Sequence, residues 1–503
     1  MQTFFQVFVH LSILAASVSA ANYPPIPQDK TTPTQQRIAM SAPDAITVGW
    51  NTYQKLTQPC VSYGTSSKNL SSVACSANSI TYPTSRTYAN SVTLTGLKPA
   101  TKYYYKIQST NTSTLTVQFK SPRQAGDKTP FTFSAVVDLG VYGKDGFTIS
   151  SASQRDMIPT VDPALNHTTI GRLATLSSGY DFVVHPGDLA YADDWMETAS
   201  NLLDGKNAYE AIIENFYNQL APIAQQKPYM TSPGNHEATC SEVTPAFCGA
   251  GQNNFTDFQT RFGPIMPSAF PSRSSNADAM AAQSKAKSLA LPPYWYSFEY
   301  GLVHFVMGST ETDFDNAPDS PGGSTNPNLG QAPRGSNGQQ LQWLEADLAS
   351  VDRSVTPWVV FSGHRPWYTT SSSSSPSNGC TACKAAFEPL LYKYGVDLAI
   401  FGHEHNSQRF NPIYNGTVDP AGLNNPKAPM YIVAGAAGNI EGLTAVNYKP
   451  PATAFANGND YAFATISVQN STNLKVKFIR SVDGALLDQS VLYKNHTTQF
   501  VRQ

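Results

Sequence analysis

Five short motifs place side chains that bind metal ions or transfer protons beside turn-forming residues. In chain order they read DLG, GDLAY, GNHE, GH and GHEH, and each contains a glycine. Glycine lets the backbone turn sharply or approach another group closely, so each motif can present its neighbouring side chains to a ligand. The candidate side chains are Asp138, Asp188, Tyr191, Asn235, His236, His364, His403 and His405.

Without His236, this set offers two carboxylates, a phenol, an amide oxygen and three imidazoles, which is more than one metal ion needs. Two ions roughly 3.5–4 Å apart, bridged by a carboxylate, can hold the attacking and leaving oxygens of an in-line displacement. Carboxylate and phenolate oxygens favour a trivalent ion, whereas imidazole and amide groups suit a divalent ion such as Zn, Fe(II) or Mn. The motifs contain no cysteine, which argues against a structural zinc site. The residue types therefore predict a binuclear metal site.

Each motif alone also has a purely structural explanation. Asp138 could cap a helix, Tyr191 could be a core aromatic residue, and His364 could be a hydrogen-bonded buried histidine. The GHEH motif is more specific, because two histidines spaced i, i+2 at the end of a strand point to one side. Five motifs in one chain, at predicted strand ends, favour one common site.

The apolar segments that precede the motifs are predicted to be buried strands, because they are short and rich in β-branched and aromatic residues. Helices are predicted near residues 206–224, 338–351 and 384–394. Strands that alternate with helices predict a layered α/β catalytic domain over residues 131–503, which includes the C-terminal strands. In such sheets, ligands bind outside the carboxyl ends of the strands, where the motifs lie.

Residues 22–122 have a different pattern. The segments AITVGWNT and NSVTLTGL alternate apolar and polar residues, and turn residues recur every ten or so positions, which predicts a β-sandwich. The segment GLKPATKYYYKI is typical of a fibronectin type III-like module, and residues 121–130 are predicted to be a polar linker. Within the catalytic domain, residues 238–292 are predicted to be an irregular insertion that could form part of a lid.

The N-terminus is typical of an exported protein. Residues 1–20 have an apolar core and small residues, Val18 and Ala20, at the positions that precede signal cleavage. The cysteines are expected to form disulfides in an oxidising compartment, most simply in the pairs 60–75, 240–248 and 380–383. Glycosylation is expected at some of the N-x-S/T sequons. The sequons are at Asn69, Asn111, Asn166, Asn254, Asn415, Asn470 and Asn495.

Composition narrows the classes of partner. The formal net charge is −2 and charged residues make up 14% of the chain, so neither nucleic acid nor an anionic membrane is an expected partner. No segment after the signal reaches the roughly 20 apolar residues of a membrane span. The sequence therefore predicts a protein in the extracellular space or the cell wall.

Together the five motifs resemble the metallophosphoesterase superfamily. Tyr191 narrows the resemblance to the purple acid phosphatases, whose pattern of DxG, GDxxY, GNH(D/E), xxxH and GHxH is complete here. The upstream module resembles the large fungal and plant forms. The resemblance implies an αββα-type catalytic domain that follows an N-terminal β-sandwich. It also implies a phosphate-ester substrate and a centre of Fe(III) plus a divalent metal, Zn, Fe or Mn.

The resemblance also assigns roles to the residues that match. Asp138, Asp188, Tyr191 and His405 match the ligands of the ferric ion, and Asp188 matches the bridge. Asn235, His364 and His403 match the ligands of the divalent ion. His236 matches a histidine that contacts the substrate, and it is the best candidate to donate a proton to the leaving oxygen.

This chain departs from the plant enzymes in one place. The segment GHRPWYTTSSSSSPSNG lacks the paired histidines found there, so Arg365 or Tyr368 is either a substitute or a structural residue. His185 and His304 lie on predicted strands and are expected to be buried and hydrogen-bonded, with His185 also a candidate to orient a ligand.

The predicted function is that of a secreted acid phosphatase which hydrolyses phosphate monoesters with a metal-bound hydroxide as the nucleophile. The alternatives are a phosphodiesterase or nucleotide pyrophosphatase of the same superfamily, against which Tyr191 argues, and a secreted binding protein without activity. The sequence leaves phytate, sugar phosphates and phosphoproteins open as substrates, and leaves the oligomeric state unassigned.

Overall fold

The computed structural model describes residues 23–109, 114–142, 168–196, 205–238, 249–267, 274–318, 338–376 and 379–496. The signal segment 1–20, the sequons at Asn111 and Asn166, and the pair Cys240 and Cys248 lie outside the described residues. Of the predicted disulfides, Cys60–Cys75 and Cys380–Cys383 are formed. None of the described helices is both long and apolar enough to cross a membrane.

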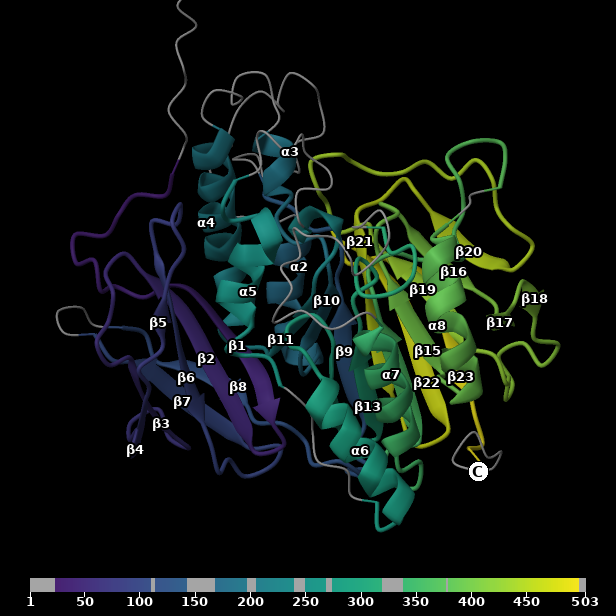
Figure 1. Ribbon diagram of the computed structural model, residues 1–503, viewed down its shortest axis with the longest axis horizontal. Coiled ribbons are helices and arrows are strands. Elements are labelled where there is room, and N and C mark those ends of the chain that lie inside the picture. Colours follow the sequence, from purple (N-terminus) through teal and green to yellow (C-terminus); the bar gives the residue numbers. More distant parts are fainter. Residues whose placement is uncertain are drawn as a thin grey trace, which may run out of the picture.

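Two antiparallel four-stranded sheets form the N-terminal region, which Figure 1 shows in purple and blue. Their orders are β1-β2-β6-β5 and β4-β3-β7-β8. In β7 the residues alternate between buried and more exposed, and Tyr103, Tyr105 and Ile107 point inward. The strands are β1 (Thr34–Ala42), β2 (Ala45–Thr52), β3 (Cys60–Gly64), β4 (Ser72–Cys75), β5 (Ser79–Ile80), β6 (Tyr88–Leu94), β7 (Lys102–Ile107) and β8 (Val117–Lys120).

The first of these sheets is covered on its outer face, which alternation alone does not predict. Every residue of β2 is buried. On neighbouring β1, the guanidinium of Arg37 donates to the backbone oxygen of Arg261, which lies in α5 of the following region. The tyrosine Tyr53 likewise donates to Glu214 of α4 at 2.8 Å. The N-terminal region is therefore held against the C-terminal region by buried polar contacts.

Two larger sheets form the C-terminal region (Figure 1). The six-stranded sheet has the order β11-β10-β9-β21-β22-β23, and β9, β10 and β11 run parallel. The seven-stranded sheet has the order β12-β13-β14-β15-β19-β16-β20, and β13, β14, β15 and β19 run parallel. Aromatic rings fill the space between the sheets, where Phe133 of β9 contacts Phe305 of β13 with ring centroids 5.0 Å apart.

The strands of the six-stranded sheet are β9 (Phe131–Ala135), β10 (Val183–Pro186), β11 (Tyr229–Ser232), β21 (Ala462–Val468), β22 (Asn473–Arg480) and β23 (Leu486–Tyr493). Those of the seven-stranded sheet are β12 (Tyr296–Tyr300), β13 (Val303–Met307), β14 (Trp358–Ser362), β15 (Leu398–Phe401), β16 (Ser407–Phe410), β19 (Met430–Ala434) and β20 (Thr453–Asn457). A small hairpin joins β17 (Ile413–Tyr414) and β18 (Thr417–Val418).

Helices flank the two sheets on opposite sides (Figure 1). On the seven-stranded side, Asp347 of α7 pairs with His304 of β13, and Phe387 of α8 contacts Phe361 of β14. This arrangement agrees with the predicted layered α/β class. The helices are α2 (Thr169–Thr175), α3 (Ala192–Met196), α4 (Gly205–Ala224), α5 (Thr256–Phe262), α6 (Ala277–Leu289), α7 (Gln339–Ser350) and α8 (Thr381–Lys393).

The expectation of an irregular insertion over residues 238–292 is wrong over two segments, because helix α5 (Thr256–Phe262) lies in its first half and helix α6 (Ala277–Leu289) lies in its second half. Helix α6 packs against α7. Its sequence consists mostly of alanine, lysine, serine and glutamine, of which only serine is a weaker helix former. The side chain of Asn276 caps it by accepting from the backbone N–H groups of Asp278 and Ala279. Asn276 follows a run of serines typical of a loop, so its role as the N-cap of a helix was not predicted.

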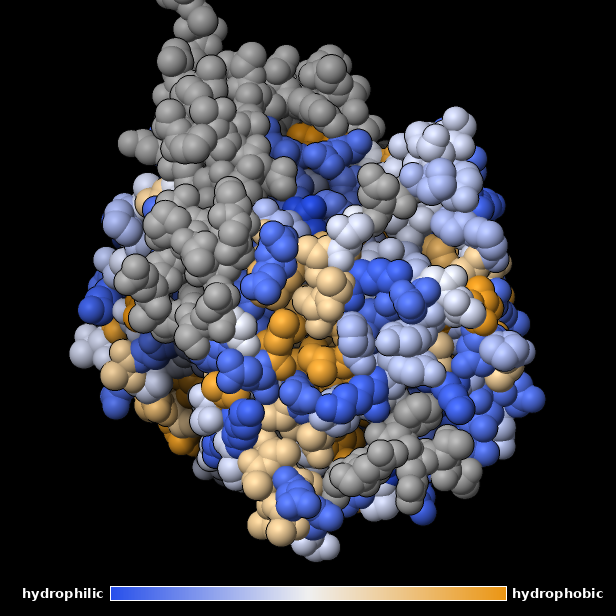
Figure 2. Space-filling model, turned by 45° about the vertical axis from the view of Figure 1, so that its right-hand side comes forward, coloured by the Kyte–Doolittle hydropathy of each residue, from blue (hydrophilic) through white to orange (hydrophobic). Residues whose placement is uncertain are grey.

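The described sequons differ in exposure. Asn69, Asn415 and Asn470 are exposed, and Asn254 and Asn495 are half-buried. Figure 2 shows one face of the molecule, on which a small group of apolar residues is surrounded by hydrophilic ones. Because charged residues are few, uncharged polar side chains contribute much of this hydrophilic surface. The boundaries of the predicted domains stay a prediction.

Candidate metal centre

Strand ends bring the candidate residues together at one edge of the two sheets. Asp138 follows β9, Asp188 follows β10, and Asn235 follows β11 in the six-stranded sheet. His364 follows β14 and His403 follows β15 in the seven-stranded sheet. Because β9, β10 and β11 run parallel, as do β14 and β15, their carboxyl ends lie at the same edge of each sheet, as the sequence predicts.

Four of the candidate residues hold a left-handed backbone. The φ angles are 61° at Asp138, 53° at Asp188, 54° at Tyr191 and 68° at His403. A side chain in this region costs on the order of 1–3 kcal/mol, and aspartate and histidine adopt it more readily than tyrosine. The surrounding fold supplies that energy, and such strain is concentrated at functional sites in proteins.

Two glycines allow the motifs to approach each other. A Cβ atom on Gly187 would lie 2.6 Å from the Cα of Gly234 and 2.8 Å from Nδ1 of His364. A Cβ atom on Gly234 would lie 2.2 Å from Oδ1 of Asp188. All three distances are far below van der Waals contact, so the glycines of GDLAY and GNHE are needed for close packing of the turns.

One half of the site gathers around the phenol of Tyr191. Its Oη lies 2.9 Å from Oδ1 of Asp138 and 2.9 Å from Nε2 of His405. It lies 3.3 Å from Oδ2 of Asp188. Four side chains from three separate motifs therefore direct oxygen and nitrogen atoms to one point.

The other half gathers around His364. Its Nε2 lies 2.9 Å from Oδ2 of Asp188 and 3.0 Å from Oδ1 of Asn235. One ligand atom from each of Asp188, His364 and His403 can be chosen so that all lie within 4.8 Å of one another. The same oxygen, Oδ2 of Asp188, thus faces both Tyr191 and His364, which is the arrangement a bridging carboxylate needs.

The charges at this edge fit bound cations. Asp138 and Asp188 are fully buried, and among the described residues no lysine or arginine lies within ion-pair distance of either. Burial raises the pKa of Asp138 well above its usual range, and the charge of Asp188 adds to the effect. Burial and the same two carboxylates raise the pKa of the Tyr191 phenol. A metal ion would reverse both effects, because it stabilises carboxylate and phenolate.

The imidazoles differ in their charge. Burial lowers the pKa of His403 well below 6.5, helped by Arg365, and lowers that of His405 to about 4. Both rings are therefore neutral with a lone pair available, as a metal ligand must be. Burial also opposes the charged form of His364, but Asp188 outweighs it and raises the pKa to about 9.

His236 lies beside the cluster and is oriented by a residue that sequence reasoning missed. Its Nδ1 lies 2.9 Å from Oδ1 of Asp193, and its Nε2 lies 3.8 Å from Oδ2 of Asp188. Burial opposes protonation, but Asp193 and Asp188 raise the pKa of His236 well above 6.5. The signal for Asp193 was an acidic residue two positions after Tyr191 in GDLAYAD.

Glu237 is a second residue that sequence reasoning did not single out, although it completes the GNHE motif. Its buried carboxylate accepts from the backbone N–H groups of Asp188 at 2.8 Å, Leu189 at 2.7 Å and Gly234 at 3.0 Å. These bonds tie the GDLAY turn to the GNHE turn. Glu237 therefore holds the left-handed backbone at Asp188 in place.

The remaining candidate residues differ in whether they lie at the cluster. Arg365 contacts His403 with Nη1 3.0 Å from Nε2, whereas Tyr368 donates to Glu388 and accepts from the backbone of Gly416. Only Arg365 thus lies at the cluster. His185 is buried, as predicted, between Tyr229 at 2.6 Å and the backbone oxygen of Asp188 at 3.2 Å. His304 is also buried and bonds to Asp347.

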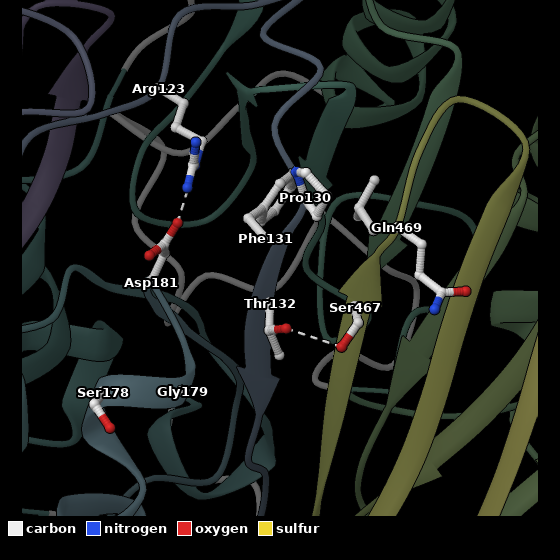
Figure 3. A pocket seen from close by; sticks show the side chains of 10 residues that line it. Arg123, Pro130, Phe131, Thr132, Ser178, Gly179, Asp181, Ser467 and Gln469 are labelled. Carbon is white, nitrogen blue, oxygen red and sulfur yellow. Dashed lines mark hydrogen bonds and ion pairs between the residues drawn. The ribbon is translucent and has the colours of Figure 1, made fainter.

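A cavity of about 570 Å³ lies at the opposite edge of the six-stranded sheet (Figure 3). Phe131 and Thr132 at the start of β9 line it, with Ser467 at the end of antiparallel β21. Arg123 and Asp181 form an ion pair in its wall. This cavity is at the amino ends of the parallel strands, away from all the candidate ligands.

Comparison with protein families gives three matches. Residues 33–121 match the purple acid phosphatase N-terminal domain, residues 164–407 match the calcineurin-like phosphoesterases, and residues 428–489 match the iron/zinc purple acid phosphatase-like protein C.

Individual proteins extend these matches. Acid phosphatase A of Cryphonectria parasitica is 57% identical over 511 residues, which cover 100% of both chains. The acid phosphatase of Aspergillus ficuum is 30% identical over 81% of this chain and 76% of that protein. The probable purple acid phosphatase 20 of Arabidopsis thaliana is 29% identical over 94% of this chain and 90% of that protein.

A solved structure shares the fold. The purple acid phosphatase PPD1 from yellow lupin (Lupinus luteus) seeds has a TM-score of 0.66 with 23% identity. The match covers 92% of this chain and 75% of the lupin chain.

Proposed function

Because the chain belongs to the purple acid phosphatase family, we propose that it hydrolyses phosphate monoesters at acidic pH with a binuclear centre of Fe(III) and a divalent ion. The observation that carries this proposal is the position of Asp188. Its Oδ2 lies 3.3 Å from Tyr191 Oη and 2.9 Å from His364 Nε2, so one carboxylate joins a phenol-containing half to an imidazole-containing half.

The donor set divides between the two ions by chemical type. Asp138, Tyr191 and His405 would hold the ferric ion, because anionic oxygens favour a trivalent cation. Asn235, His364 and His403 would hold the divalent ion, Zn, Fe or Mn. When bound, the two ions would neutralise phosphate oxygens and lower the pKa of water enough to supply hydroxide at acidic pH.

His236 is the proposed general acid. Asp193 holds its Nδ1 at 2.9 Å, so the other ring nitrogen, Nε2, is directed toward the cluster. A carboxylate that binds one nitrogen fixes the ring orientation and favours the imidazolium form. In that form Nε2 carries the proton that the leaving alcohol oxygen needs when the phosphorus–oxygen bond breaks. Gln252 also donates to Asp193, at 3.0 Å, and keeps this carboxylate in place.

Secretion and glycosylation belong to the same proposal. The apolar segment at residues 1–20 and the formed disulfides Cys60–Cys75 and Cys380–Cys383 support an oxidising destination. The exposed sequons at Asn69, Asn415 and Asn470 are accessible to glycan transfer.

The test uses the purified full chain with p-nitrophenyl phosphate and bis(p-nitrophenyl) phosphate at pH 5 and pH 7, together with metal analysis. We expect the monoester to be hydrolysed faster than the diester, with the higher rate at pH 5 and a visible charge-transfer band that Tyr191→Phe removes. A colourless, fully active protein with two zinc ions would contradict the iron centre. Preference for the diester would instead favour a phosphodiesterase.

A further inference from the structure

Arg365 has an unusual position, because its guanidinium joins a buried carboxylate to the candidate metal site. Its Nε lies 2.8 Å and 3.1 Å from the two carboxylate oxygens of Glu311. Its Nη1 lies 3.0 Å from Nε2 of His403. The Arg365 side chain is 17% exposed, whereas that of Glu311 is 0% exposed. The arginine therefore has one edge fixed in the protein and another edge directed at the site.

Glu311 and its neighbour Thr310 hold Arg365 from two sides. Oγ1 of Thr310 accepts from the backbone N–H of Arg365 at 2.7 Å and from that of His364 at 3.1 Å. The same hydroxyl donates to Glu311 at 3.2 Å. A buried carboxylate is strongly destabilising without a cation, so the ion pair with Glu311 fixes the arginine stem. Little side-chain entropy remains to be lost when the guanidinium binds another anion.

The contact between Arg365 and His403 is incompatible with a neutral, metal-bound His403. A neutral imidazole has one nitrogen with a lone pair and one with a hydrogen. If a metal takes the Nε2 lone pair, Nε2 can no longer accept from Arg365. If a metal takes Nδ1, Nε2 carries the hydrogen and faces another donor. In both cases the N–H that points at His403 must turn to a different acceptor.

We propose that Arg365 contacts the substrate, with its terminal guanidinium nitrogens bound to phosphate oxygens of the ester on the His364 and His403 side, and with Glu311 as its positioning residue. The inference rests on the proposed function, since it assigns a further residue to the same reaction. A guanidinium fits two phosphate oxygens with two parallel N–H bonds, and charge-assisted bonds of this kind are roughly twice as strong as neutral ones. A lysine would supply the positive charge but not the two parallel N–H groups.

The experiment measures the affinity of the metal-loaded full chain for inorganic phosphate by isothermal titration calorimetry, with the metal content determined for every sample. We expect Arg365→Met to weaken phosphate binding about 10- to 100-fold at unchanged metal content, and Arg365→Lys to fall between this variant and the native protein. Arg123→Met is the matched control, because it removes a similarly buried arginine–carboxylate pair at the opposite edge of the sheet. It should bind phosphate like the native protein.

A second pair of variants separates positioning from folding. Glu311→Gln keeps Arg365 but removes its anchor, so KM for p-nitrophenyl phosphate should rise severalfold more than kcat falls. The double variant Glu311→Gln/Arg365→Met leaves no unpaired buried charge, and it should bind phosphate as weakly as Arg365→Met even if the single variant fails to fold. Native affinity in a folded Arg365→Met or double variant overturns the proposal, as does a loss of metal that accounts for the loss of affinity. If the native protein itself neither binds phosphate nor hydrolyses the ester, the proposed function fails instead.

Discussion

The two edges of the six-stranded sheet bury carboxylates in opposite ways. At the amino edge, beside the cavity of Figure 3, Asp181 contacts Lys120 at 3.2 Å, Arg123 at 3.1 Å and the Tyr300 hydroxyl at 2.8 Å. Burial alone would raise the pKa of Asp181, but these partners hold it below its usual value. The charge at this edge is neutralised by the chain itself.

At the carboxyl edge, Asp138 and Asp188 are more deeply buried, and no described lysine or arginine pairs with either. Their neighbours are a phenol, histidines and backbone N–H groups. The difference shows that burial of a carboxylate does not by itself identify a metal site. Asp138 and Asp188 lack a fixed cation and also lie among the phenol and imidazole groups of the candidate site. The predictions below test this distinction between the edges.

The largest effect is expected for Asp188→Asn. An amide cannot bridge two cations as a carboxylate does, so the rate of p-nitrophenyl phosphate hydrolysis at acidic pH should fall on the order of 10³-fold, about 4 kcal/mol of transition-state stabilisation. The matched control is Asp181→Asn at the amino edge. It should lose stability to urea but keep its metal content and its activity per folded molecule. Equal rates for native protein and Asp188→Asn would contradict the site.

Removal of the metal ions should destabilise the protein, and this loss of stability should come only from the candidate site at the carboxyl edge. A ligand present at about 1,000 times its Kd stabilises the folded state by about 4 kcal/mol, so chelation should lower the unfolding free energy by about that amount. Urea titrations with and without a chelator measure it. Chelation should lower the unfolding free energy of Arg123→Met as much as that of the native protein. It should lower that of Asp188→Asn much less. The same stability with and without metal would be inconsistent with the site.

His304, which pairs with a carboxylate away from the candidate site, should make the stability of the protein depend on pH. Burial lowers the pKa of His304, but Asp347 and Glu299 outweigh it and raise the pKa from 6.5 to about 9. Its stabilisation, on the order of 3 kcal/mol, is therefore fully present below pH 6.5 and lost as the pH rises through 9. Urea unfolding should show His304→Gln to be far less stable than native protein at pH 5.5 and nearly equal above pH 9. A difference independent of pH would rule this out.

The histidine–carboxylate pair at the candidate site, His236 and Asp193, should instead affect the rate of ester hydrolysis. His236 and Asp193 are 2.9 Å apart, close to the 2.8 Å between His304 and Asp347. We expect His236→Ala to lower kcat for p-nitrophenyl phosphate about 10²-fold, because the leaving oxygen loses its proton donor. His304→Gln should leave kcat per folded molecule unchanged. The loss should be smaller with a substrate whose leaving group is more acidic, and a uniform loss would argue against general acid catalysis.

Much of the fold was predictable from the sequence, because local patterns determine it. The predicted fold class, an N-terminal β-rich region followed by a metallophosphoesterase catalytic domain, is confirmed. Strands β9, β10, β11, β14 and β15 end beside the motifs, since apolar runs and turn glycines are local signals. Helix α6 was missed because its alanine-rich sequence follows a serine-rich run and its cap depends on a single asparagine.

The candidate site was predictable in its ligands but not in its supporting residues. Seven ligand candidates stood in recognisable motifs, and the structure places them at one edge. Asp193, Glu237 and Glu311 are acidic residues like many others in the sequence, and their roles depend on partners 43 to 54 positions away. Contacts at that separation depend on how the strands are ordered, which the sequence pattern does not specify.

The pairing of β21 with β9 has a consequence for how the protein is made. Asp138 follows β9, and β9 is completed on one side by β21, residues Ala462–Val468, near the end of the chain. A ribosome that has produced all the ligands, up to His405, has still not produced this neighbouring strand. The candidate site is therefore complete only late in synthesis, and a chain truncated before Ala462 carries every candidate ligand but lacks the strand that pairs with β9.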